Sequence, residues 1–355
     1  MIGGVILLLL SAGAIAVAAG AAIPAPPTTP PTKIPITSPL PKAPPSGKTA
    51  GYVICNLPTC ALFMPGYKAA AAALHWKAKF FVYTGTDPQP AMFQAIQAHV
   101  NYISITGASV AQFKNALAAA KKANIPVIEQ SATDTANPKA GLYGDIGGSP
   151  TYGRYTQVVD QWMARDSGGK ANVVFVNIPD FPILATGEKQ ARANLAAICS
   201  SCTFDTLEVT VNDLGSGGVP SKVIAYLQTH PEVNYVEVSF GDLITGIPEA
   251  LKGAGFSGKV KLTSVSATQP VLKGIADGSV AAGNVQPQGY FEWVHFDRFA
   301  RLALHLPLAQ QTQAELLPTY VVDTADAANA LLAKGGVWDG PAGYPAAFKK
   351  LWRVK

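Results

Sequence analysis

From Gly51 onward, short apolar runs alternate with longer helical segments, and this alternation constrains the fold more than any other feature. The runs at residues 52–55 and 79–83 are short, buried in character and rich in strand-favouring residues. The alanine-rich segment 62–75 between them has the composition of a helix. Short apolar strands joined by crossover helices form a parallel sheet that is covered on both faces. The sequence therefore predicts the α/β class.

The alternation occurs twice, separated by a glycine-rich stretch at residues 141–148 that we interpret as a hinge. This predicts two Rossmann-like lobes with parallel sheets, joined by a hinge that the chain crosses several times. The helix expected at 291–306 and the strand expected at 318–323 return the chain to the first lobe and then to the second. The first lobe is expected at residues 50–143 plus about 287–318. The second lobe is expected at 144–286 plus about 319–355.

The N-terminal part has a different character from the rest. Residues 5–23 are apolar, alanine-rich and uncharged, so residues 1–23 are expected to be a signal peptide or a membrane anchor. Residues 24–49 are proline-rich and are expected to be an extended linker without partners. These features predict export to the cell surface or periplasm. If the apolar segment is retained, it would tether the exported protein to the membrane.

The four cysteines fall in two close pairs, Cys55 with Cys60 and Cys199 with Cys202. Four cysteines allow three pairings, and local pairing is the simplest in an oxidising compartment. We therefore expect two structural disulfides. The spacing of Cys199 and Cys202 also occurs in redox and metal motifs, but no second pair with zinc-site spacing accompanies it.

Net charge gives no sign of a nucleic-acid partner. Six of the 27 basic residues precede the first acidic residue, Asp87, which leaves 21 basic against 22 acidic residues in the remainder. The five histidines do not fall at expected strand ends, and no nucleophile elbow, phosphate-binding loop or dinucleotide motif is present. We therefore expect neither catalysis nor a cofactor or metal.

Several segments together resemble the type I periplasmic binding proteins, in particular the sugar-binding-like substrate-binding proteins of ABC transporters. The resemblance covers about residues 50–355, and the segments that carry it are 51–75, 116–128, 227–236, 276–286 and 344–352. It implies the type I periplasmic binding fold, a monomer, a small-molecule ligand between the lobes and an ABC permease as partner.

The resemblance and the general behaviour of parallel sheets both place ligand contacts at the carboxyl ends of the strands. Phe63 has an alternative interpretation as a core residue at a helix start, and Asp242 as a helix cap. The candidate ligand-binding residues are Asn56, Phe63, Ser131, Phe181, Thr186, Phe240, Asp242, Ser266 and Gln286.

Compared with the sugar binders, this sequence lacks charged groups at the expected cleft positions. Ser266 lies in a stretch where an aspartate is usual, Phe240 stands where an amide is common, and the turn at 178–182 has no arginine. Gln286 matches a family position. Without charged groups to hold several hydroxyls, the pocket suits a small neutral ligand, sugar-like or less polar, with an aromatic or alicyclic body. The function that the resemblance implies first is that of the extracytoplasmic solute-binding protein of an ABC importer. A ligand-sensing component of a sensor kinase or chemoreceptor, without transport, is the alternative.

Overall fold

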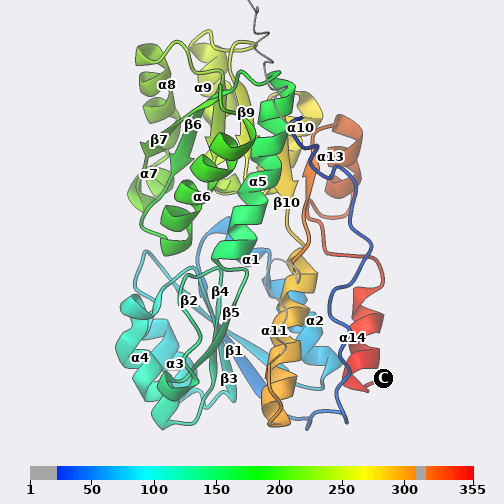
Figure 1. Cartoon of the computed structure of the whole chain (residues 1–355). Coiled ribbons are helices and arrows are strands. Elements are labelled where there is room, and N and C mark those ends of the chain that lie inside the picture. Colours follow the sequence, from blue (N-terminus) through cyan, green and yellow to red (C-terminus); the bar gives the residue numbers. More distant parts are fainter. Residues whose placement is uncertain (1–21, 309–316) are drawn as a thin grey trace, which may run out of the picture.

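The computed structural model describes residues 22–308 and 317–355. These residues form two α/β lobes, one above the other, with several chain segments passing between them (Figure 1). Each lobe contains a sheet of parallel or mostly parallel strands with helices around it, so the predicted fold class is confirmed.

The first lobe, at the bottom of Figure 1, has a parallel sheet of order β2-β1-β3-β4-β5. Its central strands are almost wholly buried, because their apolar side chains face helices on both sides. The strands are β1 (Thr49–Cys55), β2 (Lys77–Tyr83), β3 (Tyr102–Thr106), β4 (Val127–Gln130) and β5 (Leu142–Ile146). The helices are α1 (Pro58–Ala61), α2 (Met64–Ala73), α3 (Gln89–Gln97), α4 (Val110–Lys122) and the 3₁₀ turn η1 (Pro138–Ala140).

The second lobe has a sheet of order β11-β10-β9-β8-β6-β7, in which β11 alone runs antiparallel to its neighbour among the described strands. The strands are β6 (Asn172–Asn177), β7 (Thr203–Glu208), β8 (Tyr235–Val238), β9 (Lys261–Ser264), β10 (Ala282–Val285) and β11 (Tyr320–Val322). The helices and 3₁₀ turn are α5 (Ser149–Asp166), α6 (Pro182–Ile198), α7 (Val211–Ser216), α8 (Val219–Thr229), η2 (Gly241–Ile244), α9 (Ile247–Gly253), α10 (Gln269–Asp277) and α13 (Ala325–Leu332).

The glycine-rich stretch at 141–148, expected to be a hinge, is mostly the strand β5. It pairs with β4 as the last strand of the first sheet. The crossing itself is confined to Gly147 and Gly148, between β5 and α5. Gly147 has a φ of +75°, and a Cβ there would lie 2.3 Å from the Phe291 ring. Only glycine fits this position without displacing that ring.

The C-terminal part crosses between the lobes more often than expected. After β10, helix α11 (Gln288–Ala303) returns to the first lobe and packs on α2. Strand β11 and helix α13 lie in the second lobe, against β10 and α10. We expected all of residues 319–355 in the second lobe, but α14 (Tyr344–Trp352) packs on α11 in the first. The cause is apolar contact: the Trp352 ring stacks on Trp293 of α11 with centroids 5.1 Å apart.

Residues 22–48, here called the N-terminal strap, are extended, but the expectation that they have no partners is wrong. At one end, the Arg165 guanidinium donates to the Ile23 carbonyl (2.9 Å) and the Val321 N–H to the Pro27 carbonyl (2.8 Å), both in the second lobe. At the other end the strap lies on the first lobe, where the Trp76 indole donates to the Pro45 carbonyl (2.8 Å). The strap therefore runs along both lobes, as Figure 1 shows beside α13 and α14.

Two apolar side chains fix the strap to the first lobe. Ile36 is 4% exposed and Leu40 is fully buried. The Leu40 N–H donates to the Leu351 carbonyl of α14 (2.8 Å), and the Arg301 side chain of α11 donates to the Ser38 carbonyl (2.7 Å). Proline fixes the backbone conformation of such a segment, but interspersed apolar residues decide whether it packs.

Both expected disulfides are present, Cys55–Cys60 and Cys199–Cys202. Most of the expected signal or anchor segment lies at residues 1–21, outside the described residues. Among the described residues, no helix combines the length and apolar character that spanning a membrane requires.

Candidate ligand-binding site between the lobes

A pocket of about 100 Å³ lies between the two lobes. Segments of both lobes line it, and its wall contains no charged side chain from the described residues. Its walls come from Cys55, Leu57, Thr59, Cys60, Phe63, Thr106, Gly107, Ser131, Gly147, Tyr152, Tyr155, Phe181, Ile183, Leu184, Phe240, Ser266 and Gln286.

Most of these residues lie at the carboxyl ends of strands. In the first lobe, Cys55 ends β1, Thr106 ends β3 and Ser131 follows β4. In the second lobe, Ser266 and Gln286 follow β9 and β10 closely. Parallel strands bring their carboxyl ends to one edge of each sheet, and the two edges face each other across the pocket.

Two serines on opposite walls share an unusual backbone conformation. Ser131 has a φ of +51° and Ser266 a φ of +59°, both in the left-handed region. The backbone is held there by hydrogen bonds, from the Ser131 N–H to the Ile146 carbonyl and from the Ser266 N–H to the Asn284 side chain, each 2.8 Å. Non-glycine residues adopt this conformation at a cost and cluster at ligand sites.

Aromatic rings form much of the remaining wall. Phe181 and Phe240 of the second lobe meet edge to face, with centroids 6.5 Å apart. Phe63 of the first lobe packs edge to face on Phe291 of α11 at 5.3 Å, so it belongs both to the core and to the pocket. Such rings offer apolar faces to a flat or ring-shaped ligand.

Tyr152 and Tyr155 lie one helical turn apart at the start of α5, and both line the pocket. The Tyr152 hydroxyl donates to the Ser239 carbonyl (2.6 Å), which fixes the ring. Its close packing needs Gly187, where a Cβ would lie 2.0 Å from that ring. The Tyr155 hydroxyl is buried and has no hydrogen-bond partner among the described residues. Burial raises its pKa, so it stays protonated and can donate.

Three further polar side chains of the wall are available to a ligand. The hydroxyls of Ser131 and Ser266 and the amide of Gln286 form no hydrogen bond within the part of the chain that the structure describes. With Tyr155 they supply both donors and acceptors, and none carries a formal charge. A ligand with a few hydroxyl or carbonyl groups would satisfy them.

The carboxylate of Asp242 lies beside the pocket, next to the wall residue Thr59. The Thr59 N–H of the first lobe donates to its Oδ2 at 3.0 Å, across the boundary between the lobes. Asp242 is 7% exposed. Burial raises its pKa to about 6, and the hydrogen bond from Thr59 opposes this rise.

The structure places six of the nine sequence-predicted residues in the pocket wall, and their role in binding stays a prediction. These are Phe63, Ser131, Phe181, Phe240, Ser266 and Gln286. The other three do not line it. Asn56 is exposed, because β1 ends at Cys55 and the chain turns outward before α1. Thr186 lies in the second turn of α6, after the wall residues Ile183 and Leu184, and Asp242 accepts from Thr59.

Sequence reasoning missed the two tyrosines of α5 and the apolar residues Ile183 and Leu184. The tyrosines were missed because candidate contacts were sought at the carboxyl ends of strands, whereas Tyr152 and Tyr155 lie at the start of helix α5. Their spacing, three residues apart just after a glycine pair, is the signal that could have found them.

A family model of the periplasmic binding protein domain matches residues 60–294. This chain belongs to the periplasmic binding protein family. The match spans both lobes and includes most of the pocket wall. No curated protein sequence matches the chain.

Solved structures of similar fold support this assignment. A solute-binding protein of an ABC transporter from Agrobacterium vitis, bound with α-D-tagatopyranose, has a TM-score of 0.69 and 17% identity, covering 81% of this chain and 98% of its own. A carbohydrate transporter protein from Acidothermus cellulolyticus 11B, in complex with myo-inositol, has a TM-score of 0.65 and 17% identity, covering 83% and 99%. The similarity shows that the chain has the type I periplasmic binding fold.

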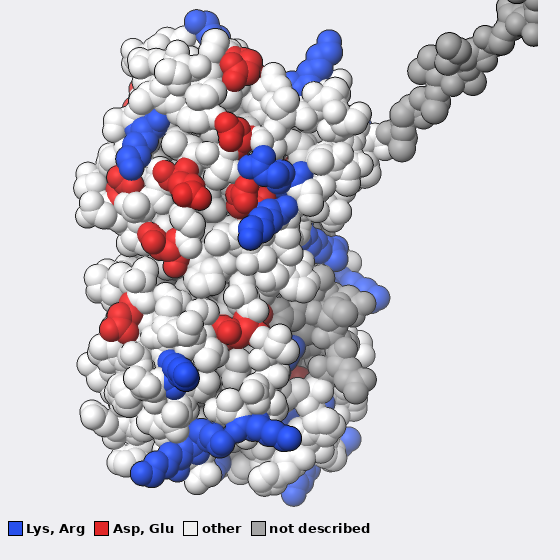
Figure 2. Space-filling model, turned by 60° about the vertical axis from the view of Figure 1, so that its left-hand side comes forward, with Lys and Arg blue, Asp and Glu red and all other residues white. Residues whose placement is uncertain are grey.

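The surface of this periplasmic binding protein carries both signs of charge. On the face shown in Figure 2, acidic and basic side chains are interspersed over both lobes, with an indentation between them.

Proposed function

We propose that this protein is an exported, monomeric solute-binding protein of an ABC importer that closes on a small neutral ligand and releases it unchanged. The observation that carries the proposal is the pocket between the lobes. Among the described residues its wall has no charged side chain, yet it offers hydroxyl and amide groups without a hydrogen-bond partner. Burying an unpaired ligand charge among such walls would be costly, so a neutral molecule is favoured.

Pocket size and composition narrow the ligand class. The volume of about 100 Å³ is of the same order as the ~150 Å³ apolar cavity that holds benzene. Aromatic rings and the Cys55–Cys60 disulfide form apolar walls, whereas Ser131, Ser266, Tyr155 and Gln286 provide polar contacts. These features support a compact ring with few polar groups, less hydroxylated than the tagatose and inositol found in the similar structures.

Export and the transport role are supported by family membership and by the two disulfides, which form in oxidising compartments. Closure of two lobes around a solute is the physical event that a permease can recognise. The pocket needs no catalytic group for this role, because the ligand is bound and released without chemical change.

Mass spectrometry of the solute that co-purifies with the protein tests the proposal. The extract should contain a neutral, low-molecular-weight compound that is absent from the Phe240→Asp variant, which places a charge in the pocket. Phe93→Asp is the matched control, because Phe93 is 37% exposed on α3, and it should retain the compound. A formally charged solute, or equal recovery from both variants, would contradict the proposal. Deletion of the protein should then reduce cellular uptake of the same compound.

A further inference from the structure

The Cys55–Cys60 disulfide lies in the pocket wall, a position that stabilising the fold alone does not require. Cys55 is the last residue of β1 and Cys60 lies in α1, and both line the pocket. Each is 6% exposed. The bridge closes a small ring around the loop that carries Leu57 and Thr59, two further wall residues.

Helix α1 has little to hold it in place by itself. It is four residues long, has no side-chain cap and begins with a proline. Helices this short are unstable without outside support, because a single turn fixes many dihedral angles for few hydrogen bonds. Besides the disulfide, the hydrogen bond from the Asn56 N–H to the Tyr83 carbonyl (3.1 Å) joins the start of this loop to β2.

The position of α1 matters because its N-terminal turn reaches the other lobe. Thr59 is the second residue of α1, so its N–H has no partner within the helix. This N–H donates to Asp242 Oδ2 of η2, 3.0 Å away. A hydrogen bond to a buried carboxylate is stronger than one between neutral groups, but it weakens steeply when the donor moves.

We propose that the Cys55–Cys60 disulfide is a positioning element for lobe closure, which holds α1 where the Thr59 N–H meets Asp242. The proposal rests on the proposed function in that closure is taken to serve ligand capture. The disulfide acts through α1 and Thr59, and it makes no chemical change to a ligand.

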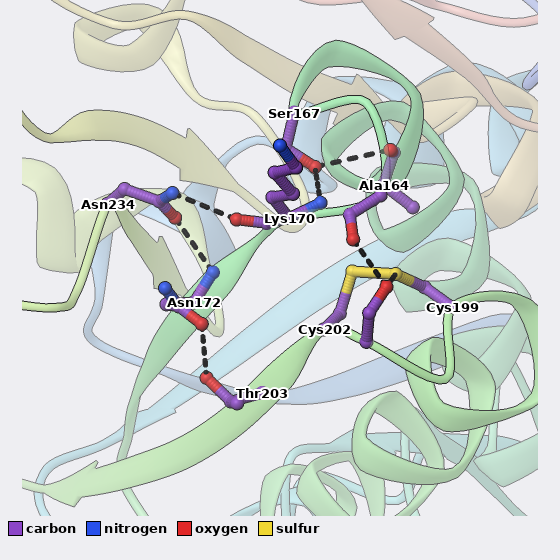
Figure 3. The surroundings of a disulfide bond; sticks show 10 residues. Ala164, Ser167, Lys170, Asn172, Cys199, Cys202, Thr203 and Asn234 are labelled. Atoms are coloured by element: carbon purple, nitrogen blue, oxygen red, sulfur yellow. Dashed lines mark hydrogen bonds between the residues drawn. A yellow bond between two sulfur atoms is a disulfide. The ribbon is translucent and has the colours of Figure 1, made fainter.

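The second disulfide provides a matched control within the same chain. Cys199–Cys202 joins the end of α6 to the start of β7, at the amino end of the second sheet and therefore at the opposite edge from the pocket. Figure 3 shows it beside the hydrogen bond between Thr203 and Asn172. Removing Cys199–Cys202 eliminates a disulfide that closes a similarly short loop and leaves α1 unchanged.

The test compares four ligand-free proteins: wild type, Cys55→Ser/Cys60→Ser, Cys199→Ser/Cys202→Ser and Asp242→Ala. Amide hydrogen exchange reports on Thr59, and small-angle X-ray scattering reports on closure. We expect exchange at Thr59 to rise at least tenfold in Cys55→Ser/Cys60→Ser and in Asp242→Ala, and to stay unchanged in the control. The radius of gyration should rise in Cys55→Ser/Cys60→Ser and stay unchanged in Cys199→Ser/Cys202→Ser.

A role confined to local folding would raise exchange but leave the radius of gyration unchanged, and this result would overturn the proposal. Wild-type exchange as fast as that of Asp242→Ala would also overturn it. If the double serine variant does not fold, dithiothreitol is applied to folded Cys199→Ser/Cys202→Ser. There it transfers two electrons and two protons to the remaining disulfide and becomes a cyclic disulfide, and the same two readouts apply. Because no solute is present, these outcomes are independent of whether the protein binds one.

Discussion

The backbone N–H of Thr59 and the carboxylate of Asp242 are joined by a 3.0 Å hydrogen bond that links the first lobe to the second. The donor lies on α1 and the acceptor on η2, beside the pocket. Opening the lobes would break this bond and expose the carboxylate to water. The ionisation of Asp242 is therefore coupled to closure.

Closure should be favoured by mild acid. Burial raises the pKa of Asp242 to about 6 in the closed form, against about 4 for a hydrated aspartate. The closed form thus binds more protons between these two values, so lowering the pH from 7 to 5 should favour closure by at most tenfold per pH unit. Small-angle scattering at the two pH values measures this. The Asp242→Asn variant, which does not titrate, should show no change with pH, and the same pH response in both proteins would be inconsistent with this role.

Overall stability should also fall as the pH rises, through a different residue. Burial, with the charges of Asp134 and Asp145, raises the pKa of Glu129 on β4 to about 10. The folded state keeps this proton while the unfolded chain loses it near pH 4, so stability decreases with rising pH across this range. Glu129→Gln removes that dependence.

Urea unfolding at pH 5 and pH 8 measures the effect. Glu129→Gln should reduce the dependence of the free energy of unfolding on pH by at most about 1.4 kcal/mol per pH unit. Glu249→Gln, at an exposed position on α9, should leave the wild-type slope in place. If the two variants have the same pH profile, Glu129 is ionised in the folded protein.

The N-terminal strap should contribute to stability as part of the folded body. Leu40 is fully buried against the first lobe, so Leu40→Ala should lower the free energy of unfolding by about 2–5 kcal/mol. Leu214→Ala, at a half-buried position on the short helix α7, should cost less. Chemical denaturation compares the two. Equal, small losses would mean that the strap is detached in solution.

The sequence allowed the two-lobe architecture to be predicted because buried strands such as β1 and β3 are continuous apolar runs between helices. Strand β5 was missed, since Gly144 and Asp145 resemble a loop when the buried Arg298 beside Asp145 is not visible. The packing of the strap was missed for a related reason. Proline spacing predicts an extended backbone, whereas the burial of Leu40 depends on α14, which comes more than 300 residues later.

Much of the candidate site could be located from strand ends, because parallel strands bring Ser131, Ser266 and Gln286 to facing edges. Residues that reach the pocket from helices could not be located this way. The crossing at Gly147–Gly148 brings Tyr155 to the pocket, and the loop closed by the Cys55–Cys60 disulfide brings Thr59 there. Their positions depend on how the lobes meet, which no local pattern encodes.

Tyr155 should contribute to solute affinity more than to stability. Its hydroxyl is buried in the pocket wall without a partner among the described residues. Tyr155→Phe should therefore weaken binding of the co-purifying solute about tenfold, the value of one hydrogen bond, with unchanged or slightly higher stability. Tyr143→Phe, outside the pocket, is the control. If calorimetric titration gives the same affinity for wild type, Tyr155→Phe and Tyr143→Phe, the Tyr155 hydroxyl does not bind the solute.

Thermal unfolding with matched pairs of neutral and charged compounds tests the central claim most directly. Suitable pairs are cyclohexanol with cyclohexanecarboxylate and benzyl alcohol with benzoate, with myo-inositol added as a polyol. A compound at 100 times its Kd stabilises the folded protein by about 2.7 kcal/mol, which raises Tm measurably. We predict that neutral members raise Tm and that their charged partners do not. A rise with the carboxylates, and none with the neutral compounds, would contradict a pocket built for a neutral ligand.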